Sequence, residues 1–286
     1  MTITITTSNV NGIRAAKRKG IEQWAAKNTP DVWCMQEVRA PQNEIDPIFD
    51  EFGFEYATAG RIADQSGLDR MNEICRIKGR AGVGLLSALP VIDKRYGLPG
   101  LAKDVDSGRW IEADVKTPQG YTVTVVCVYV HAGNTDDPEK MKQKYRFLDT
   151  MLVRMGQLRD EAAHGGKQAV LCGDFNIAHT PLDIKNAKAN EKHAGFLPEE
   201  RAYVDKWLGE LEFVDVMRSL CGDIQGPYTW WSQRGRAFDN NVGWRIDYQF
   251  ATPELAETAR GFVIDKAPTY DLRWSDHAPL SITYDV

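Results

Sequence analysis

The sequence predicts an α/β sandwich with mixed or antiparallel sheets. Short segments rich in apolar or β-branched residues recur along the chain, and this pattern favours strands. Most of these segments are joined by hairpin-length turns, and amphipathic helical segments are interspersed among them, which favours packed layers of sheet and helix. The strand–helix alternation of a dinucleotide-binding fold is not seen, because residues 82–84 lack the third glycine and the helix that would follow.

The expected strands are identified by alternation or by runs of β-branched residues. Residues 2–7 alternate threonine with isoleucine, which is typical of a half-buried strand. Residues 121–130 form the richest β-branched run and are expected to be a central strand. The remaining expected strands are residues 31–36, 83–86, 168–172, 244–250 and 280–284.

Three helices are expected from the spacing of apolar residues. Residues 139–163 carry an apolar stripe with Pro138 before it and two glycines after it. A second helix begins at Pro198 with two acidic residues in its first turn, and a third covers residues 14–26, weakened by Gly20. The basic residues of the long helix are expected on its solvent face: Lys140, Lys142, Lys144 and Arg146. Residues 61–80 show the least pattern and are expected to form a long surface loop.

The chain length and composition favour one globular domain spanning residues 1–286. No repeat, low-complexity tract or linker-like stretch divides the 286 residues. No apolar run approaches the roughly 20 residues of a membrane-spanning helix, and no secretory leader is visible. Five cysteines occur singly without a Cys-x-x-Cys pair, so reduced thiols in a cytoplasmic protein are expected. We also expect a monomer.

Polar side chains cluster where the expected strands end, and their chemistry favours a hard divalent cation. Carboxylates are ligands suited to Mg²⁺ or Mn²⁺ rather than zinc. No nucleophilic serine or cysteine stands out, so attack by water is the simplest chemistry. The residues at these strand ends are Asn9, Asn11, Glu37, Tyr129, Asp174, Asn176, Asp247, Asp276 and His277. Asp104 and Asp106 are not expected to form a calcium loop, because the glycine is misplaced and no glutamate closes it.

Each of these residues also has an ordinary structural explanation. Asp174 and Asn176 could form a turn, and Asn11 precedes a glycine as in many hairpins. Glu37 could be a solvated strand end, and Tyr129 could be a core aromatic residue. Their joint occurrence in one chain, each at its own strand end, favours a functional site.

In this order, the motifs resemble those of the exonuclease III type of apurinic/apyrimidinic (AP) endonuclease. That family belongs to the deoxyribonuclease I-like group of Mg²⁺-dependent phosphodiesterases, and the resemblance implies a four-layer α-β-β-α sandwich with two sheets packed face to face. It extends from Asn9 to His277, and the segment Trp244-Arg245-Ile246-Asp247 is the part most specific to DNA repair. The motifs that carry the resemblance are residues 8–15, 36–37, 173–176, 240–248 and 275–277.

The resemblance implies a role for each residue of the strand-end cluster. Glu37 would be the principal metal ligand, and Asp174 would activate the attacking water or protonate the leaving group. His277, held by Asp247, would bind the scissile phosphate together with Tyr129. The implied metal-binding set is Glu37, Asn9, Asp276, Asp174 and Asn176, with Asn176 also orienting the attack. Whether one metal ion or two would bind is left open.

The resemblance also implies contacts to double-stranded DNA. Trp230 and Trp244, with Ile246 beside them, would wall a pocket for a flipped-out, base-less sugar. The implied DNA-binding residues are Asn11, Arg14, Asn186, Asn190, Trp230, Trp244, Arg245 and Ile246. Two departures from the family pattern are His131-Ala132, where relatives read Pro-Asn, and His193, where relatives often have asparagine.

The formal net charge of −5 disfavours nucleic acid only if charge is averaged over the whole surface. Basic residues are concentrated in four segments that flank the candidate site, namely residues 14–19, 70–80, 185–192 and 234–236. Together with these basic segments, the resemblance implies a Mg²⁺-dependent AP endonuclease that cleaves 5′ to abasic sites, with 3′→5′ exonuclease and 3′-end phosphatase or phosphodiesterase activity. The alternatives are a phosphodiesterase or phosphatase of the same superfamily acting on RNA, a nucleotide or a phosphoinositide, and a catalytically silent nucleic-acid-binding protein.

Overall fold

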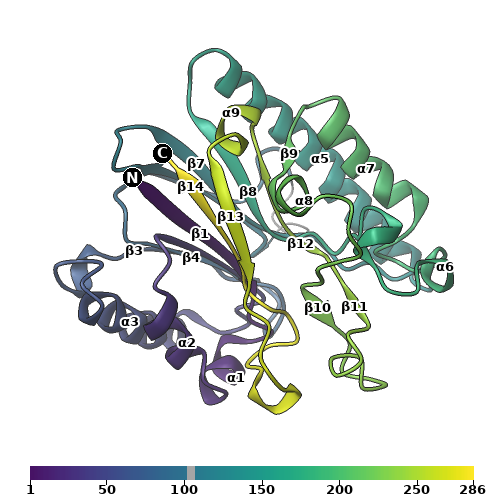
Figure 1. Cartoon of the computed structure of the whole chain (residues 1–286), viewed down its shortest axis with the longest axis horizontal. Coiled ribbons are helices and arrows are strands. Elements are labelled where there is room, and N and C mark those ends of the chain that lie inside the picture. The colour runs from purple at the N-terminus through teal and green to yellow at the C-terminus, as the bar shows by residue number, and fades with distance from the viewer. Residues whose placement is uncertain (102–106) are drawn as a thin grey trace.

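The computed structural model describes residues 1–101 and 107–286 and has the expected α/β architecture (Figure 1). Asp104 and Asp106 lie outside the described residues. Within the described ranges, the strands form two six-stranded sheets and one two-stranded sheet. None of the helices in these ranges has the length and apolar character needed to cross a membrane.

The first sheet has the strand order β13-β14-β1-β2-β4-β3. Its centre is a parallel pair, β1 with β2, and its other pairs are antiparallel. The strands are β1 (Thr2–Asn9), β2 (Val32–Gln36), β3 (Asp69–Glu73), β4 (Val83–Ser87), β13 (Ala259–Ile264) and β14 (Leu280–Asp285).

The second sheet has the order β5-β6-β7-β8-β12-β9 and is built in the same way. Its central pair, β7 with β8, is parallel, and its other pairs are antiparallel. The strands are β5 (Val91–Tyr96), β6 (Trp110–Lys116), β7 (Thr122–Tyr129), β8 (Gln168–Asp174), β9 (Val214–Asp215) and β12 (Asp247–Ala251). A separate two-stranded sheet consists of β10 (Trp230–Trp231) and β11 (Gly243–Trp244).

The helices cover the outer faces of the two sheets, so the four-layer prediction is confirmed. α1, α2 and α3 lie on one side of the sandwich, and α5 and α7 lie on the other (Figure 1). The helices are α1 (Ile13–Arg18), α2 (Ile21–Asn28), α3 (Gln42–Thr58), α5 (Pro138–Ala163), α6 (Ala187–Asn190), α7 (Pro198–Gly209), α8 (Val216–Cys221) and α9 (Pro253–Ala256). Short 3₁₀ turns are η1 (Gln65–Gly67), η2 (Pro181–Asp183) and η3 (Tyr270–Leu272).

The two-residue period of the strands explains how one chain fills three hydrophobic layers. In β2, Val32 and Cys34 point into the core between the sheets, whereas Trp33 and Met35 pack against the helices α1–α3. β7 follows the same rule on the other side, where alternate residues face the inner core and the α5–α7 layer. Because these central strands are buried on both faces, they read as continuous apolar runs in the sequence.

Several expected elements differ in extent or were not expected. Residues 61–80 are not one loop, since they contain η1 and the edge strand β3, which was missed because only Met71 of that strand is buried. The expected strand 244–250 is interrupted at residues 245–246, and the helix 14–26 is divided at Gly20, which has a φ of +98°. α3 was not expected because Pro47 and Gly53 lie inside it.

β6 was not expected because it carries two buried carboxylates. Glu112 and Asp114 are almost fully shielded from solvent in the middle of the strand. Each is bound by basic side chains from elsewhere, for example Arg154 on Glu112 and Lys167 on Asp114. A buried charge is tolerated only when it is paired, and such pairing is not visible in a local sequence window.

Lys144 corrects the prediction that all basic residues of the long helix face solvent. α5 has the expected apolar stripe, but Lys144 has no exposed surface and lies within that stripe. Its ammonium group contacts the buried Glu200 of α7 at 2.5 Å. The prediction was wrong because a lysine can be buried where a distant carboxylate compensates its charge.

Candidate active site

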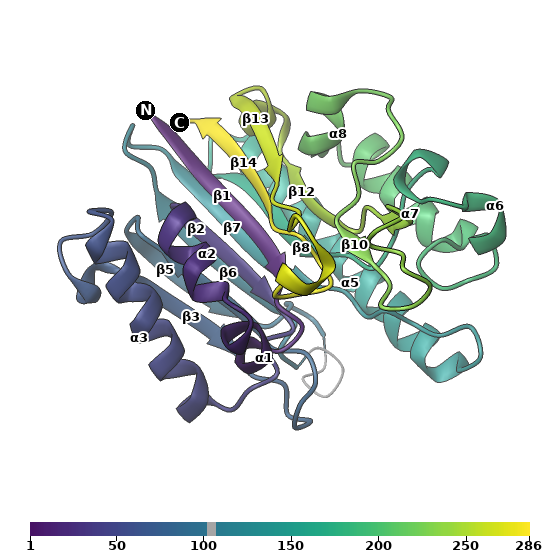
Figure 2. The same ribbon diagram turned by 60° about the horizontal axis from the view of Figure 1, so that its bottom comes forward.

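The two parallel strand pairs bring the predicted site residues to one end of the sandwich. Parallel strands end at the same edge of a sheet, so Asn9 at the end of β1 lies beside Gln36 and Glu37 at the end of β2. In the other sheet, Tyr129 at the end of β7 is paired with Asp174 at the end of β8. The loops after these strands gather at the end opposite the chain termini, because Thr2 is paired with Asp285 (Figure 2).

The side chain of Asn9 joins the two sheets. Its Nδ2 donates hydrogen bonds to Glu37 Oε1 at 3.0 Å and to Asp174 Oδ2 at 2.9 Å. Its Oδ1 accepts the backbone N–H of Asn11, and its backbone carbonyl accepts the Ser275 hydroxyl. A single neutral amide therefore separates two buried carboxylates that would otherwise repel each other.

Glu37 is held by donors on both carboxylate oxygens. The Tyr129 hydroxyl donates to Oε1 at 2.6 Å, and the guanidinium of Arg39 forms an ion pair with Oε2. Glu37 has a φ of +54°, in the left-handed region that costs a non-glycine residue of the order of 1 kcal/mol or more. The hydrogen bonds from Asn9 and Tyr129 and the ion pair with Arg39 hold the carboxylate in place, and they offset the cost of this backbone conformation.

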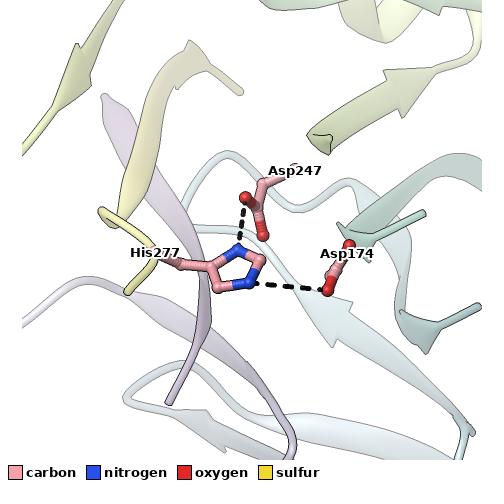
Figure 3. Close-up of side chains that lie close together, drawn as sticks. All are labelled: Asp174, Asp247 and His277. Atoms are coloured by element: carbon pink, nitrogen blue, oxygen red, sulfur yellow. Dashed lines mark hydrogen bonds and ion pairs between the residues drawn. The ribbon is translucent and has the colours of Figure 1, made fainter. Parts of the chain in front are cut away.

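His277 lies between two aspartates from the second sheet (Figure 3). Its Nδ1 is 2.9 Å from Asp247 Oδ2, and its Nε2 is 3.8 Å from Asp174 Oδ2. Asp247 stands opposite Asp174 in the β12–β8 ladder, which fixes the separation of the two carboxylates. The hydrogen bond to Nδ1 orients the ring, so Nε2 is directed to the same space as Asp174.

Asn176 follows Asp174 in a tight turn with a φ of +50°. Its backbone N–H donates to Asp174 Oδ1 at 2.9 Å, and its Nδ2 donates to the Val130 carbonyl at 3.0 Å. Asparagine adopts the left-handed conformation more readily than most residues, which explains why the turn takes this residue. Asp174 and Asn176 therefore do form a turn, as one interpretation of the sequence suggested, and this turn holds the carboxylate of Asp174.

The electrostatic field of the cluster changes the protonation of its members. Burial raises the pKa of Asp174 to about 7, and Asp247 and Glu37 act in the same direction, whereas His277 and the Asn9 hydrogen bond oppose them. Burial alone would lower the pKa of His277, but Asp247 and the other carboxylates raise it to about 10. Burial also raises the pKa of Tyr129 well above its usual value. At neutral pH the site therefore holds an imidazolium and a neutral phenol as donors.

The donor set fits a hard divalent cation. Ligand atoms of Asp174, Asp247 and His277 lie within 4.8 Å of one another, although a protonated imidazole cannot ligate a metal. Asp247 Oδ1 is buried without a hydrogen-bond partner, and Glu37 Oε2 is satisfied only by the Arg39 ion pair. Carboxylate oxygens whose negative charge is not fully balanced by protein donors are the ligands that Mg²⁺ and Mn²⁺ prefer.

A pocket of about 470 Å³ opens directly above this cluster. Trp230 and Trp244 form one wall, with ring centroids 6.0 Å apart and planes at 86°. Gly195 packs against the face of Trp244, where an added Cβ would lie 3.0 Å from the ring. The pocket therefore has a charged floor and an aromatic wall of two nearly perpendicular indole rings, and Ile246 also lines it.

The other predicted DNA-binding residues lie at different distances from the pocket. Asn11 and Asn190 line it, and Asn11 donates to Asp276 Oδ1 at 2.8 Å. Asn186 is exposed at the start of α6. Arg14 is half-exposed and paired with Glu44. Of the departures noted in the sequence, Ala132 and His193 both line the pocket.

The predicted DNA contact of Arg245 stays a prediction, and the structure places this side chain among buried carboxylates. It has no exposed surface, and its Nε donates to Asp183 Oδ1 at 2.7 Å. Its Nη2 lies 2.7 Å from Asp215 Oδ2. The peptide N–H of Arg245 also donates to the Asp183 carbonyl at 2.7 Å. Arg245 thus anchors the segment between the two pocket residues Trp244 and Ile246 to η2.

Two residues that matter for the site were not identified from the sequence. Arg39 lies at the pocket and binds both Glu37 and Asn11. Its proximity to Glu37, two residues earlier in the chain, could have indicated this contact. Asp183 contacts Arg245 and Arg218, and only the fold brings these residues together.

Comparisons with known proteins show which family this chain belongs to. The model of the Endonuclease/Exonuclease/phosphatase family matches residues 6–277. The chain is 29% identical to an exodeoxyribonuclease of Bacillus subtilis over 97% of this chain and 98% of that protein. It is 30% identical to a DNA-(apurinic or apyrimidinic site) endonuclease of Dictyostelium discoideum over 97% of this chain and 69% of that protein. The crystal structure of an AP endonuclease from Archaeoglobus fulgidus superposes with a TM-score of 0.81 at 30% identity, covering 99% of this chain and 100% of the other.

The raised pKa of Asp174 can be measured directly in metal-free protein. The carboxyl-carbon NMR signal of Asp174, assigned with the Asp174→Asn variant, should titrate with a midpoint near pH 7. Because folding favours the protonated carboxyl, the free energy of unfolding should decrease as pH rises from about 4 to 7. Asp183, whose pKa is held at about 2, serves as a control that stays ionised over this range. A midpoint near 4 for Asp174 would contradict the electrostatic interpretation.

The buried ion pairs that Asp183 forms with Arg245 and Arg218 should contribute strongly to stability. Asp183→Asn leaves the buried guanidinium with one carboxylate fewer and should lower the free energy of unfolding in urea by about 3–5 kcal/mol. Burial alone would raise the pKa of Asp183, but Arg245 and Arg218 lower it to about 2. The contribution is therefore present above pH 4 and should disappear as pH falls through 2. Asp205→Asn, which changes an exposed carboxylate, is the control. An equal effect of both variants would refute the stabilising role of the Asp183 ion pairs.

Proposed function

Because the chain belongs to the endonuclease/exonuclease/phosphatase family, we propose that it is a metal-dependent DNA-repair phosphodiesterase. It would cut double-stranded DNA 5′ to abasic sites, with 3′→5′ exonuclease and 3′-end phosphatase or phosphodiesterase activity. The observation that carries the proposal is the position of Asp174, His277 and Glu37 at the floor of a pocket walled by two tryptophans.

His277 and Tyr129 supply the donors for the scissile phosphate. The imidazolium of His277 presents Nε2 toward the pocket while Asp247 holds Nδ1. The Tyr129 hydroxyl remains protonated at neutral pH, because burial raises its pKa well above the usual value. The ring of His277 is fixed before the phosphate arrives, which favours stabilisation of developing negative charge. The Tyr129 hydroxyl donates to Glu37 Oε1 and would redirect this hydrogen bond to the phosphate.

Asp174 is the group that handles the proton of the attacking water or of the departing 3′ oxygen. Its pKa of about 7 allows either role at physiological pH, because both protonation states are populated. Asn9 and the backbone N–H of Asn176 fix the two carboxylate oxygens, so the proton is taken up or released at a defined position.

Glu37 is the residue that would be the principal ligand of a Mg²⁺ or Mn²⁺ ion. The other proposed metal-binding residues are Asn9, Asp276, Asp174 and Asn176. A bound ion would supply Lewis-acid stabilisation of the phosphate oxygen and lower the pKa of water. Arg39 forms an ion pair with Glu37 and partly compensates its charge.

The pocket shape favours a sugar without a base. Trp230 and Trp244, with nearly perpendicular ring planes, offer apolar surface to a deoxyribose ring, and Ile246 lines the pocket beside them. An abasic nucleotide has no stacking or pairing to lose, so its extrusion from the helix costs less than that of an intact nucleotide. Selectivity for damage would follow from both effects.

Basic side chains extend the site along the surface. A second hollow of about 470 Å³ shares Tyr129, Ala132 and Gly133 with the active pocket. Arg76, Arg80, Arg109 and Lys140 line it. Phosphate groups of the DNA backbone on either side of the scissile bond would bind such a surface.

Other assignments fit the site less well. A phosphodiesterase for RNA, a nucleotide or a phosphoinositide would share the charged floor, but the extended basic surface favours a polymer. A silent nucleic-acid-binding protein would not need the paired carboxylates and imidazole. We further propose that the protein acts as a monomer and works in the cytoplasm, where its five free cysteines would remain reduced.

The function is tested with a duplex that carries one abasic-site analogue. We expect cleavage 5′ to the analogue in Mg²⁺ and none in chelator, with Asp174→Asn lower in rate by about 10²–10⁴-fold. Asp205→Asn should cleave like the wild type. Chelator-resistant cleavage would refute the metal-dependent mechanism. Binding without cleavage would favour the silent protein, and a faster reaction with a soluble phosphoinositide would favour the other phosphatase class.

The basic hollow is tested by the salt dependence of DNA binding. Arg76→Ala and Arg80→Ala should each reduce the slope of log Kd against log salt concentration by about one, because one phosphate contact is lost. Binding is measured by fluorescence anisotropy in chelator with the abasic duplex. Arg260→Ala, a change at an exposed arginine near the chain termini, is the matched control. Unchanged slopes in the first two variants would place the DNA elsewhere.

A further inference from the structure

Lys144 and Glu200 form a buried ion pair that none of the steps above uses. Both side chains have no exposed surface, and Lys144 Nζ lies 2.5 Å from Glu200 Oε1. A buried ion pair is a poor source of stability, because desolvation of two charges costs about as much as their attraction returns. Stability alone therefore does not explain this pair, and its hydrogen bonds to neighbouring backbone groups suggest another role.

The ammonium of Lys144 binds two loops that line the active pocket. Nζ donates to the Ala132 carbonyl at 3.1 Å and to the Asn176 carbonyl at 2.9 Å. With the contact to Glu200, all three N–H donors of the ammonium have an acceptor. A single side chain of α5 thus connects the segment that follows β7 to the turn that follows Asp174.

Glu200 holds a third pocket segment. Its Oε2 accepts the backbone N–H of Gly195 at 2.6 Å and that of Leu197 at 3.0 Å. Gly195 packs against Trp244 and lies close to the Asn176 carbonyl, where an added Cβ would be 3.1 Å away. The pair therefore sits behind the aromatic wall as well as behind the catalytic turn.

Close packing leaves these loops little freedom around the pair. An added Cβ on Gly133 would lie 2.7 Å from Met141 Sδ and 3.2 Å from Lys144 Cδ. The Ala132–Gly133 backbone therefore rests directly on the lysine stem. A shift of Lys144 would be transmitted to Asn176, whose N–H and Nδ2 fix the carboxylate of Asp174.

We propose that the Lys144–Glu200 pair is a positioning element for the phosphodiesterase reaction, since it fixes three separate backbone segments around Asp174 and the pocket wall. The proposal rests on the function proposed above. Lys144 and Glu200 do not contact the substrate; they act through Asn176 and Gly195. A displacement of about 1 Å at reacting groups can lower a rate by about 100-fold, so the effect of losing the pair should be large.

The test uses the double variant Lys144→Met/Glu200→Leu, which keeps side-chain volumes and leaves no buried charge unpaired. Single-turnover cleavage of the abasic duplex is measured at saturating enzyme in Mg²⁺, with Lys142→Met as the control, since Lys142 is exposed on the same helix. The rate constant should fall by about 30-fold or more, while Kd for the duplex in chelator stays within about threefold. A purely structural role would lower the fraction of folded enzyme, which is counted by stoichiometric binding of the duplex in chelator, and leave the rate constant at saturating enzyme unchanged. That result would overturn the proposal.

A second measurement on the wild type does not depend on a folded variant. In native-state hydrogen exchange, the amides of Gly195 and Leu197 should be protected to the same degree as those of β8. Exchange at the rate of an exposed loop would overturn the proposal, since the glutamate would then not hold this segment. If the wild type and Lys142→Met both fail to cut the duplex, the proposed function fails, and the exchange data still test the tie between the loops.

Discussion

The hydrogen bonds of Asn9 to Glu37 and Asp174 are the interaction on which the site depends. The two carboxylates come from different sheets, so the amide fixes the distance between the sheets where the chemistry is concentrated. It also lowers the cost of two negative charges in a buried volume, because each carboxylate gains a donor without a further charge. Replacement of the amide by a carboxylate would add repulsion at the same point.

The fold makes this contact by placing a parallel strand pair at the centre of each sheet. β1–β2 and β7–β8 are flanked by antiparallel strands, so each sheet has one edge where two carboxyl ends meet. When the sheets pack face to face, these two edges lie against each other and the polar side chains converge. The hydrophobic layers thus set the position of the site, and the hydrogen bonds of Asn9, Tyr129 and Asn176 set its details.

Local signals made the central strands and the strand-end polar residues predictable. The isoleucines of residues 2–7 and most of residues 123–130 are buried by period-two packing, and the residue types in the sequence show this period directly. The edge strand β3 and the strand β6 were not predictable, because one buries little and the other buries carboxylates whose partners are far away in the chain. The pKa of Asp174 could not be predicted either, since it depends on burial, on the charges of His277, Asp247 and Glu37, and on the hydrogen bond from Asn9.

Two fully buried basic residues share one physical explanation. Lys144 was expected in solvent and Arg245 was expected to bind DNA, and both are fully buried against carboxylates distant in sequence. The ammonium of Lys144 binds the backbone carbonyls of Ala132 and Asn176, whereas the guanidinium of Arg245 binds the carboxylates of Asp183 and Asp215. A cation buried in this way offers donors in fixed directions, which an apolar side chain cannot do. The charge of Arg245 thus fixes the segment between Trp244 and Ile246 through buried carboxylates, and the charge of Lys144 fixes two loops of the pocket through their carbonyl groups.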